Sequence, residues 1–248
     1  MAGIRVTLPA MICVGMCVLA GRAGAQQLDQ AAVIRGVDAA VRYRIDRITQ
    51  YTVTEKYAVY HGSEGTTPVA GMTVKTTYRR GIGKNYDIQS QSGSAIIRHL
   101  GLEPILEREK EINEPGNVEH AWITSANYDM TLKPGTQRVN GHACYELTIH
   151  PKEKAPNLID GSIWVDTKDF TILRLEGVSS KSPSIFAGTT HMQRDYADLD
   201  GVSMATHARA ESSTFLYGTT IVTIDYTGYN IQQVQAAVAP AGGKAGAR

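Results

Sequence analysis

The sequence predicts an α+β fold built on one large antiparallel sheet. Three observations support this prediction: a tight hairpin between Asp160 and Gly177, turn signals about every ten residues in the second half of the chain, and a helix-favouring run between two groups of strands. Helices in the middle of a β-rich chain must bury their apolar side chains against the sheet. We therefore expect the helices to lie on one face of it.

The hairpin is the clearest element, because successive side chains of a strand point to opposite faces of a sheet. Ile163 and Val165 point to one face and Trp164 to the other, and the turn falls at 166–169. The second strand starts at Phe170 and is apolar on both faces. A strand covered on both faces lies inside a sheet, so we expect the hairpin to have neighbours on both sides.

The first residues have the pattern of a secretory signal peptide. Residues 6–20 form an apolar run after a basic start, and Ala23-Gly24-Ala25 fits the small-residue pattern before a cleavage site. A membrane anchor needs about 20 apolar residues, so this run is too short for one. The two cysteines inside the run do not stand at a lipidation site. We expect residues 1–25 to be a signal peptide that is cleaved near Ala25, which places the mature chain in the periplasm.

Charge and cysteine content narrow the class of protein. The chain has 25 basic and 24 acidic residues, and the signal peptide carries two of the basic ones, so the mature chain is close to neutral. A neutral chain does not attract nucleic acid. Cys144 is the single cysteine after residue 25, so an internal disulfide is excluded and the fold depends on its core.

The other elements follow in chain order. A helix begins at an Asp29 N-cap and carries an apolar stripe of Ile34, Val37, Val41, Ile45 and Ile48. A helical insertion is predicted at 94–125, with a kink or restart at Pro104 and another start at Glu114. Alternation and turn residues predict strands at 51–60, 72–80, 86–89, 128–132, 136–139, 143–149, 189–199, 202–213 and 219–231. Residues 26–235 form the single predicted domain, and 236–248 are expected to be a disordered tail.

Known catalytic and metal-binding motifs are absent from the sequence. His99 and Glu103 form an i, i+4 pair, but a metal site needs three or more ligands, so a surface hydrogen bond is expected. The segment Gly81 to Lys84 lacks the first glycine and the hydroxyl residue of a phosphate loop. The charged run after Pro104 is interpreted as a solvated helix face that includes Glu107, Glu109 and Glu111. We expect that the protein is not an enzyme and that it binds no metal and no cofactor.

The order of elements and the central hairpin resemble the LolA/LolB superfamily of periplasmic lipoprotein carriers. The strand Gly161-Ser162-Ile163-Trp164-Val165-Asp166 and the return Phe170-Thr171-Ile172-Leu173-Arg174-Leu175-Glu176 are similar to that family's central hairpin, and the likeness spans about residues 28–231. The resemblance implies a strongly curved antiparallel sheet, an incomplete β-barrel, whose open, concave side is covered by helices. It also implies an apolar cavity between sheet and helices that accepts the acyl chains of lipoproteins or other lipids.

The expected function is therefore that of a periplasmic lipid or lipoprotein carrier. Its partners would be lipid acyl chains or lipoproteins and a membrane-bound donor or acceptor protein, but no nucleic acid, and the chain would be a monomer. Apolar positions on strands and helices that should face each other are the candidate cavity residues: Val53, Tyr57, Val74, Tyr78, Ile97, Leu100, Leu106, Trp122, Tyr145, Leu147, Trp164 and Leu173. A filled core uses the same kinds of side chain, so plain core is the competing interpretation of each.

Two other functions stay open at this stage. A non-enzymatic periplasmic sensor or scaffold could use the same sheet to bind a protein partner instead of cargo. A hydrolase would need a site that no motif reveals, and Cys144 with His150 is the pair whose mutation would test it.

Overall fold

The computed structural model describes residues 29–62, 65–181, 189–214 and 218–234. The predicted signal peptide (1–25) and tail (236–248) lie outside these residues. The helical elements are α1 (Gln30–Arg47), α2 (Ala95–Ile97), the π-helical η1 (Arg98–Leu102), α3 (Glu103–Ile112) and the 3-10 helix η2 (Val118–Ala121). The strands are β1 (Ile48–His61), β2 (Ala70–Arg79), β3 (Gly83–Gly93), β4 (Tyr128–Leu132), β5 (Gln137–Val139), β6 (His142–Pro151), β7 (Ile159–Asp166), β8 (Ile172–Ser179), β9 (Thr190–Leu199), β10 (Val202–Thr214) and β11 (Gly218–Gln233).

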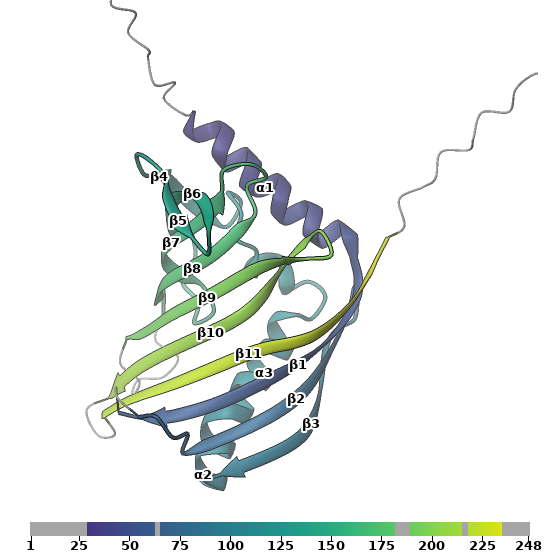
Figure 1. Cartoon of the computed structure of the whole chain (residues 1–248), viewed down its shortest axis with the longest axis vertical. Coiled ribbons are helices and arrows are strands. Elements are labelled where there is room, and N and C mark those ends of the chain that lie inside the picture. The colour runs from purple at the N-terminus through teal and green to yellow at the C-terminus, as the bar shows by residue number, and fades with distance from the viewer. Residues whose placement is uncertain (1–28, 63–64, 182–188, 215–217, 235–248) are drawn as a thin grey trace, which may run out of the picture.

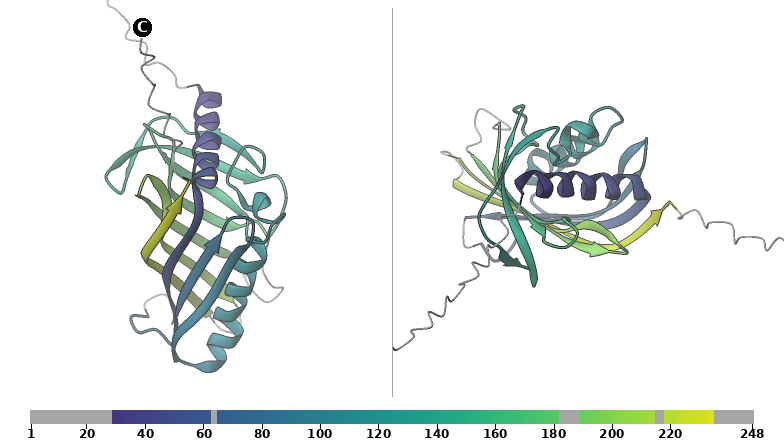
Figure 2. Two further views of the ribbon diagram at one scale, coloured as in Figure 1. Left: turned by 90° about the vertical axis from the view of Figure 1, so that its right-hand side faces the viewer. Right: turned by 90° about the horizontal axis from the view of Figure 1, so that it is seen from above.

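The described strands form one antiparallel sheet in the order β3-β2-β1-β11-β10-β9-β8-β7-β6-β4, with β5 paired to β6. The sheet is open and curved, and its two end strands are not joined (Figure 1). Seen from above, α1 lies across the hollow of the sheet (Figure 2). This is the predicted fold class, an incomplete barrel with helices on its concave side, and the prediction is confirmed.

Helix α1 begins where the sequence predicts. The Asp29 side chain accepts a hydrogen bond from the backbone N–H of Ala31 at 3.0 Å, which satisfies one of the free donors of the first turn. Val33 and Val37 are its fully buried side chains and pack on β4, β6, β7 and β8. The predicted helical stripe extended one residue too far, because Ile48 has extended backbone angles and starts β1.

The turn of the central hairpin determines how closely α1 approaches the sheet. Phe170 has a positive φ of 61° and belongs to the turn between β7 and β8, not to the second strand as predicted. A Cβ atom placed on Gly36 of α1 would clash with the Phe170 ring. The helix can rest on this ring because residue 36 is a glycine.

The predicted hairpin is confirmed, and it lies inside the sheet with β6 and β9 on either side. Ile172 packs in the core beneath α1, whereas Leu173 packs on the other face, so the start of β8 is covered on both sides. Two further turns also form where the sequence places them. Asn140-Gly141 and Asp200-Gly201 have φ values of 50° and 85°, and of 57° and 79°, which fit tight hairpin turns.

The segment between β3 and β4 differs from the prediction. A continuous helical stretch runs from Ala95 to Ile112 through α2, η1 and α3, and we call it the cap helix. The second helix expected from Glu114 does not form, because Gly116 has a φ of 91° and the chain makes one 3-10 turn. Strand β3 is also longer than the predicted 86–89, since it pairs with β2 along the whole length of β2.

Candidate ligand-binding site

The concave face of the sheet is apolar over much of its area. In β1, alternate side chains from Tyr51 to Val59 are buried, and their cross-strand neighbours continue the same face on β2 and β11. One row of paired residues crosses six strands on this face: Met72, Tyr57, Ile224, Ala208, Arg194 and Leu175. Because Leu175 belongs to the core beneath α1 and Ala208 to the core beneath the cap helix, both helices cover the same face.

The cap helix covers the part of this face made by β1, β2 and β11. Its buried side chains, Leu102 and Leu106, form one cluster with Tyr57, Met72 and Val74. Ile97 and Ile105 pack against that cluster and are partly buried. Ile105 and Leu106 follow Leu102 by three and four residues, and the five-residue step from Ile97 to Leu102 spans the π-helical η1, so a single stripe of the helix holds it on the sheet.

The cap helix contains a wide turn in its first half. Ser94 caps its start by accepting a hydrogen bond from the N–H of Ile97, and η1 then runs from Arg98 to Leu102. Pro104, two residues after the end of η1, has no N–H to donate to the preceding turn, so regular α-helical bonding is interrupted there. Wide turns of this type often occur at functional sites.

A group of polar side chains lies between the cap helix and the sheet, within the apolar surroundings. We call it the inner polar cluster, and its members are Glu55, Thr76, Lys84, Tyr86, Glu109, Arg194 and Tyr226. The carboxylate of Glu109, on α3, lies 2.9 Å from Nζ of Lys84 on β3 and 3.7 Å from Nη2 of Arg194 on β9. Four strands separate β3 from β9, a span of about 24 Å in a flat sheet. Strong curvature therefore brings the two cations to one carboxylate.

The charges of the inner polar cluster stabilise one another. The nearby Lys84 ammonium lowers the pKa of the Glu109 carboxyl to about 2, against the opposing effect of burial and with further help from Arg194. Burial by itself would lower the pKa of Lys84, but the attraction of Glu109 outweighs it and holds that pKa well above its usual value. Both groups are therefore charged at neutral pH, and the ion pair links the cap helix to the sheet.

The other members of the cluster are hydroxyl and carboxyl groups on the sheet. The Tyr57 hydroxyl donates a hydrogen bond of 2.5 Å to Oε2 of Glu55, which is 3 % exposed. Thr76 and Tyr86 face each other across β2 and β3. Among the described residues, the Thr76 and Tyr86 hydroxyl oxygens have no hydrogen-bond partner, although both atoms are buried. Buried polar atoms are normally satisfied, so these two call for an explanation.

Six of the twelve predicted cavity residues are brought together at the concave face beneath or beside the cap helix. They are Val53, Tyr57, Val74, Tyr78, Ile97 and Leu106. Tyr145 and Leu147 lie on the same face but under α1, where Leu147 is fully buried in a filled core. That these residues contact a ligand remains a prediction.

The other four predicted cavity residues lie elsewhere. Trp164 and Leu173 are on the opposite face of the sheet, where they pack with Val139 and Cys144, because they alternate with the residues that face α1. Trp122 lines a cleft of about 380 Å³ between α1 and the η2 segment, next to Asp38. Leu100 is 71 % exposed, because the cap helix turns it away from the sheet.

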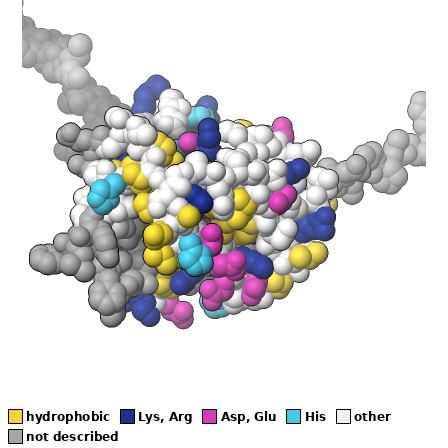
Figure 3. Space-filling model, turned by 90° about the horizontal axis from the view of Figure 1, so that it is seen from below, with side chains coloured by type: hydrophobic (Ala, Val, Ile, Leu, Met, Phe, Trp, Pro, Cys, Tyr) yellow, Lys and Arg dark blue, Asp and Glu magenta, His cyan; other side chains and the backbone are white. Residues whose placement is uncertain are grey.

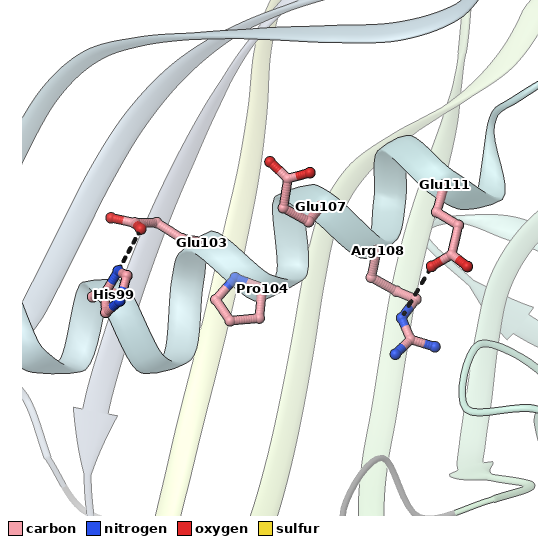
Figure 4. A pocket seen from close by; sticks show the side chains of 6 residues that line it. All are labelled: His99, Glu103, Pro104, Glu107, Arg108 and Glu111. Atoms are coloured by element: carbon pink, nitrogen blue, oxygen red, sulfur yellow. Dashed lines mark hydrogen bonds and ion pairs between the residues drawn. The ribbon is translucent and has the colours of Figure 1, made fainter.

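Apolar side chains lie open at the lower end of the molecule, beside a group of acidic ones (Figure 3). The cap helix begins at this end (Figure 1), and Ile96 and Leu100 are each 71 % exposed there. On the outer side of the helix, a shallow cleft of about 430 Å³ is lined by His99, Glu103, Pro104, Glu107, Arg108 and Glu111 (Figure 4). His99 and Glu103 form the expected surface pair at 2.8 Å.

The interpretation of Glu109 as part of a solvated helix face was wrong. Glu107 and Glu111 do lie outside, but Glu109 points to the sheet. The signal was present in the sequence, since Leu102, Leu106 and Glu109 follow the i, i+4, i+7 spacing of one helix stripe. Lys84 and Arg194 carry no such signal, because only the strand register and the curvature bring them to the site.

Two of the histidines that could serve catalysis are each paired with an aspartate. His142 contacts Asp166 at 2.7 Å and His150 contacts Asp160 at 2.8 Å, both on one part of the sheet. Cys144 is fully buried, and burial raises the pKa of its thiol, which works against a nucleophilic role. In the described ranges, no group of three or more His, Cys, Asp or Glu side chains could hold a metal ion. None of the helices described there has the length and hydropathy to cross a membrane.

No family model and no curated protein matches this sequence. Solved structures do match. A LolA superfamily protein from Nitrosomonas europaea is 10 % identical, with a TM-score of 0.42 and coverage of 84 % of this chain and 95 % of that one. A putative outer membrane lipoprotein-sorting protein domain from Vibrio parahaemolyticus is 14 % identical, with a TM-score of 0.47 and coverage of 86 % and 96 %. A DUF1329 family protein from Desulfovibrio piger is 17 % identical, with a TM-score of 0.39 and coverage of 82 % and 94 %.

Proposed function

We propose that the chain is a non-enzymatic periplasmic carrier that binds the acyl chains of a lipid or lipoprotein between the concave face and the cap helix. One observation carries this proposal: a single helix covers an apolar sheet face through one stripe of side chains, Ile97, Leu102, Ile105 and Leu106. A ligand with an acyl chain could take the place of this stripe, because both present the same kind of apolar surface to the sheet.

The cap helix is suited to move without damage to the sheet. Its backbone hydrogen bonds lie within the helix, so its departure breaks no strand pairing. It is joined to β3 at Gly93, whose positive φ of 67° marks a sharp change of chain direction. The sheet itself is continuous across the described strands, so it can stay unchanged as the helix swings away.

Two leucines of equal burial allow a direct test. Leu106 is 5 % exposed beneath the cap helix, and Leu173 is 4 % exposed on the opposite face of the sheet. Replacement of either by alanine should lower the free energy of unfolding by about 2–5 kcal/mol. Only Leu106→Ala should also favour the open state, and it should tighten the binding of a fluorescent acyl-chain probe by about 3–10-fold.

Equilibrium titration of the probe, with unlabelled lipid as competitor, measures this difference. Saturable binding to the unaltered chain, and a gain in Leu106→Ala that is missing in Leu173→Ala, would support the carrier. A chain that binds no acyl probe, while a pull-down captures a protein partner, would favour the sensor or scaffold instead.

A further inference from the structure

The inner polar cluster joins two parts that the proposed function requires to separate. Lys84 and Arg194 belong to the sheet, whereas the carboxylate between them belongs to Glu109 of the cap helix. When the cap helix leaves, the two cations lose their shared carboxylate. They are mostly buried, with 14 % and 30 % of their side chains exposed, so an uncompensated charge there is costly.

An incoming anion could take over the position of Glu109. A carboxylate or a phosphate offers the same charge and the same oxygen acceptors, and Arg and Lys both bind such groups through charge-assisted hydrogen bonds. The sheet side of the cluster also holds Glu55. The formal charge of Lys84, Arg194 and Glu55 together is therefore about +1. One negative charge on the ligand would match this formal charge.

The two unsatisfied hydroxyl groups favour a ligand with several acceptor oxygens. Thr76 is fully buried, and its Oγ1 and the Tyr86 hydroxyl have no partner within the part of the chain that the structure describes. The two residues are directly opposite each other, and Tyr86 is two residues from Lys84 on the same face of β3. Each hydroxyl has one hydrogen to donate to an acceptor oxygen of a ligand.

The surroundings of the cluster fit an attached hydrocarbon chain. Val53 pairs with Thr76, and Val74 pairs with Glu55, so apolar side chains stand next to the polar ones on the same face. Met72 and Tyr57 continue this apolar surface toward Ile224. A head group at the inner polar cluster would therefore leave its chain on the apolar concave face.

From these contacts we propose that the inner polar cluster binds the carboxylate or phosphate of an anionic amphiphile in exchange for Glu109. The inference rests on the proposed function and narrows its ligand to acyl compounds with an acidic head group. The head group competes with Glu109 of the cap helix for the same two cations, so ligand binding favours the state in which the helix has left the sheet.

A comparison of chain-matched ligands tests the inference with the unaltered protein. A fatty acid, its methyl ester and an alkyl phosphate of equal chain length are titrated against a bound fluorescent probe at neutral pH. The acid should bind about ten-fold or more tightly than the ester, since the ester lacks the charge that Lys84 and Arg194 attract. The alkyl phosphate distinguishes the two head groups: tighter binding of the acid indicates a carboxylate ligand, and tighter binding of the phosphate a phospholipid-type ligand.

Variants assign the effect to the residues. Lys84→Gln and Arg194→Gln should each weaken the binding of the fatty acid by about ten-fold and leave the binding of the ester unchanged. Glu109→Gln removes the carboxylate that competes with the ligand, and it should increase the affinity for the fatty acid more than the affinity for the ester. The matched controls are Arg209→Gln, on the opposite face of β10 and paired with Glu211, and Glu111→Gln, on the outer side of the cap helix. Neither control should alter the preference for the acid.

The outcomes separate the two proposals. If acid and ester bind equally well, acyl binding stands and the exchange at the inner polar cluster is overturned. If Arg209→Gln weakens the acid as much as Arg194→Gln does, the preference is a general charge effect and the inference is overturned as well. If none of the ligands binds, the carrier function fails and this inference fails with it.

Discussion

Replacement of Leu147 by alanine is expected to lower the free energy of unfolding by about 2–5 kcal/mol, because the side chain is fully buried beneath α1. Leu147 packs with Val33 and Val37 of α1 and with Ile163 of β7. Truncation there leaves a cavity among side chains that are held by the helix and by the strands. Acyl-probe affinity should stay the same, since this core is separate from the space under the cap helix.

Urea denaturation followed by circular dichroism measures the loss. The matched control is Leu100→Ala, at a position that is 71 % exposed, which should change the stability by less than about 0.5 kcal/mol. An equal effect of the two substitutions would contradict the filled core beneath α1. A large gain of probe binding in Leu147→Ala would show that the ligand site extends under α1.

Replacement of Glu109 by glutamine should destabilise the chain by about 2–4 kcal/mol at neutral pH, somewhat less than for a fully buried pair because the three side chains keep some contact with water. The substitution leaves Lys84 and Arg194 without their shared carboxylate. The loss should be confined largely to the cap helix if this segment opens separately from the sheet. Hydrogen exchange of residues 95–112 measures this local component.

The same ion pair predicts an acid dependence of stability. Lys84 lowers the pKa of Glu109 from an ordinary value of 4.5 to about 2 in the folded chain. A lowered pKa contributes stability above the unfolded-state value, and this contribution is lost as the pH falls from about 4.5 to about 2. The unaltered chain should therefore lose its higher free energy of unfolding relative to Glu109→Gln as the pH falls across this range.

Urea unfolding at neutral pH and at about pH 3 checks the prediction, with Glu111→Gln as control. Glu111 is on the same helix, and 67 % of its side chain is exposed. A difference between the unaltered chain and Glu109→Gln that is the same at both pH values would show that the pair does not stabilise the fold electrostatically.

Local signals were sufficient for most of the fold. The alternation in β1, the Asn140-Gly141 turn and the Asp29 cap each depend on a few adjacent residues, and each forms as predicted. The curvature of the sheet was predicted from the family resemblance of the central hairpin, because no local sequence pattern encodes it. The helix predicted from Glu114 failed because a proline after an acidic residue fits a helix start, whereas the nearby Gly116 ends regular structure.

The candidate site was harder to predict, because it depends on contacts between distant strands. Sequence alternation separates Trp164 from Ile163, but it does not tell which face the helices cover, so Trp164 and Leu173 were assigned to the wrong side. Arg194 lies in a strand with mixed polar and apolar residues, so its face is not readable from the pattern. The meeting of Lys84 and Arg194 at Glu109 follows from the strand register and the curvature of the sheet.

Photo-crosslinking tests the central claim most directly. The chain is incubated with an acyl compound that carries a light-activated group near the end of its chain, irradiated, digested and mapped by mass spectrometry. The account predicts adducts on concave-face residues such as Tyr57, Met72 and Val74 and on the cap helix, with competition by unlabelled lipid. Adducts confined to the opposite face around Val139 and Leu173, or no adducts that lipid can compete away, would contradict it.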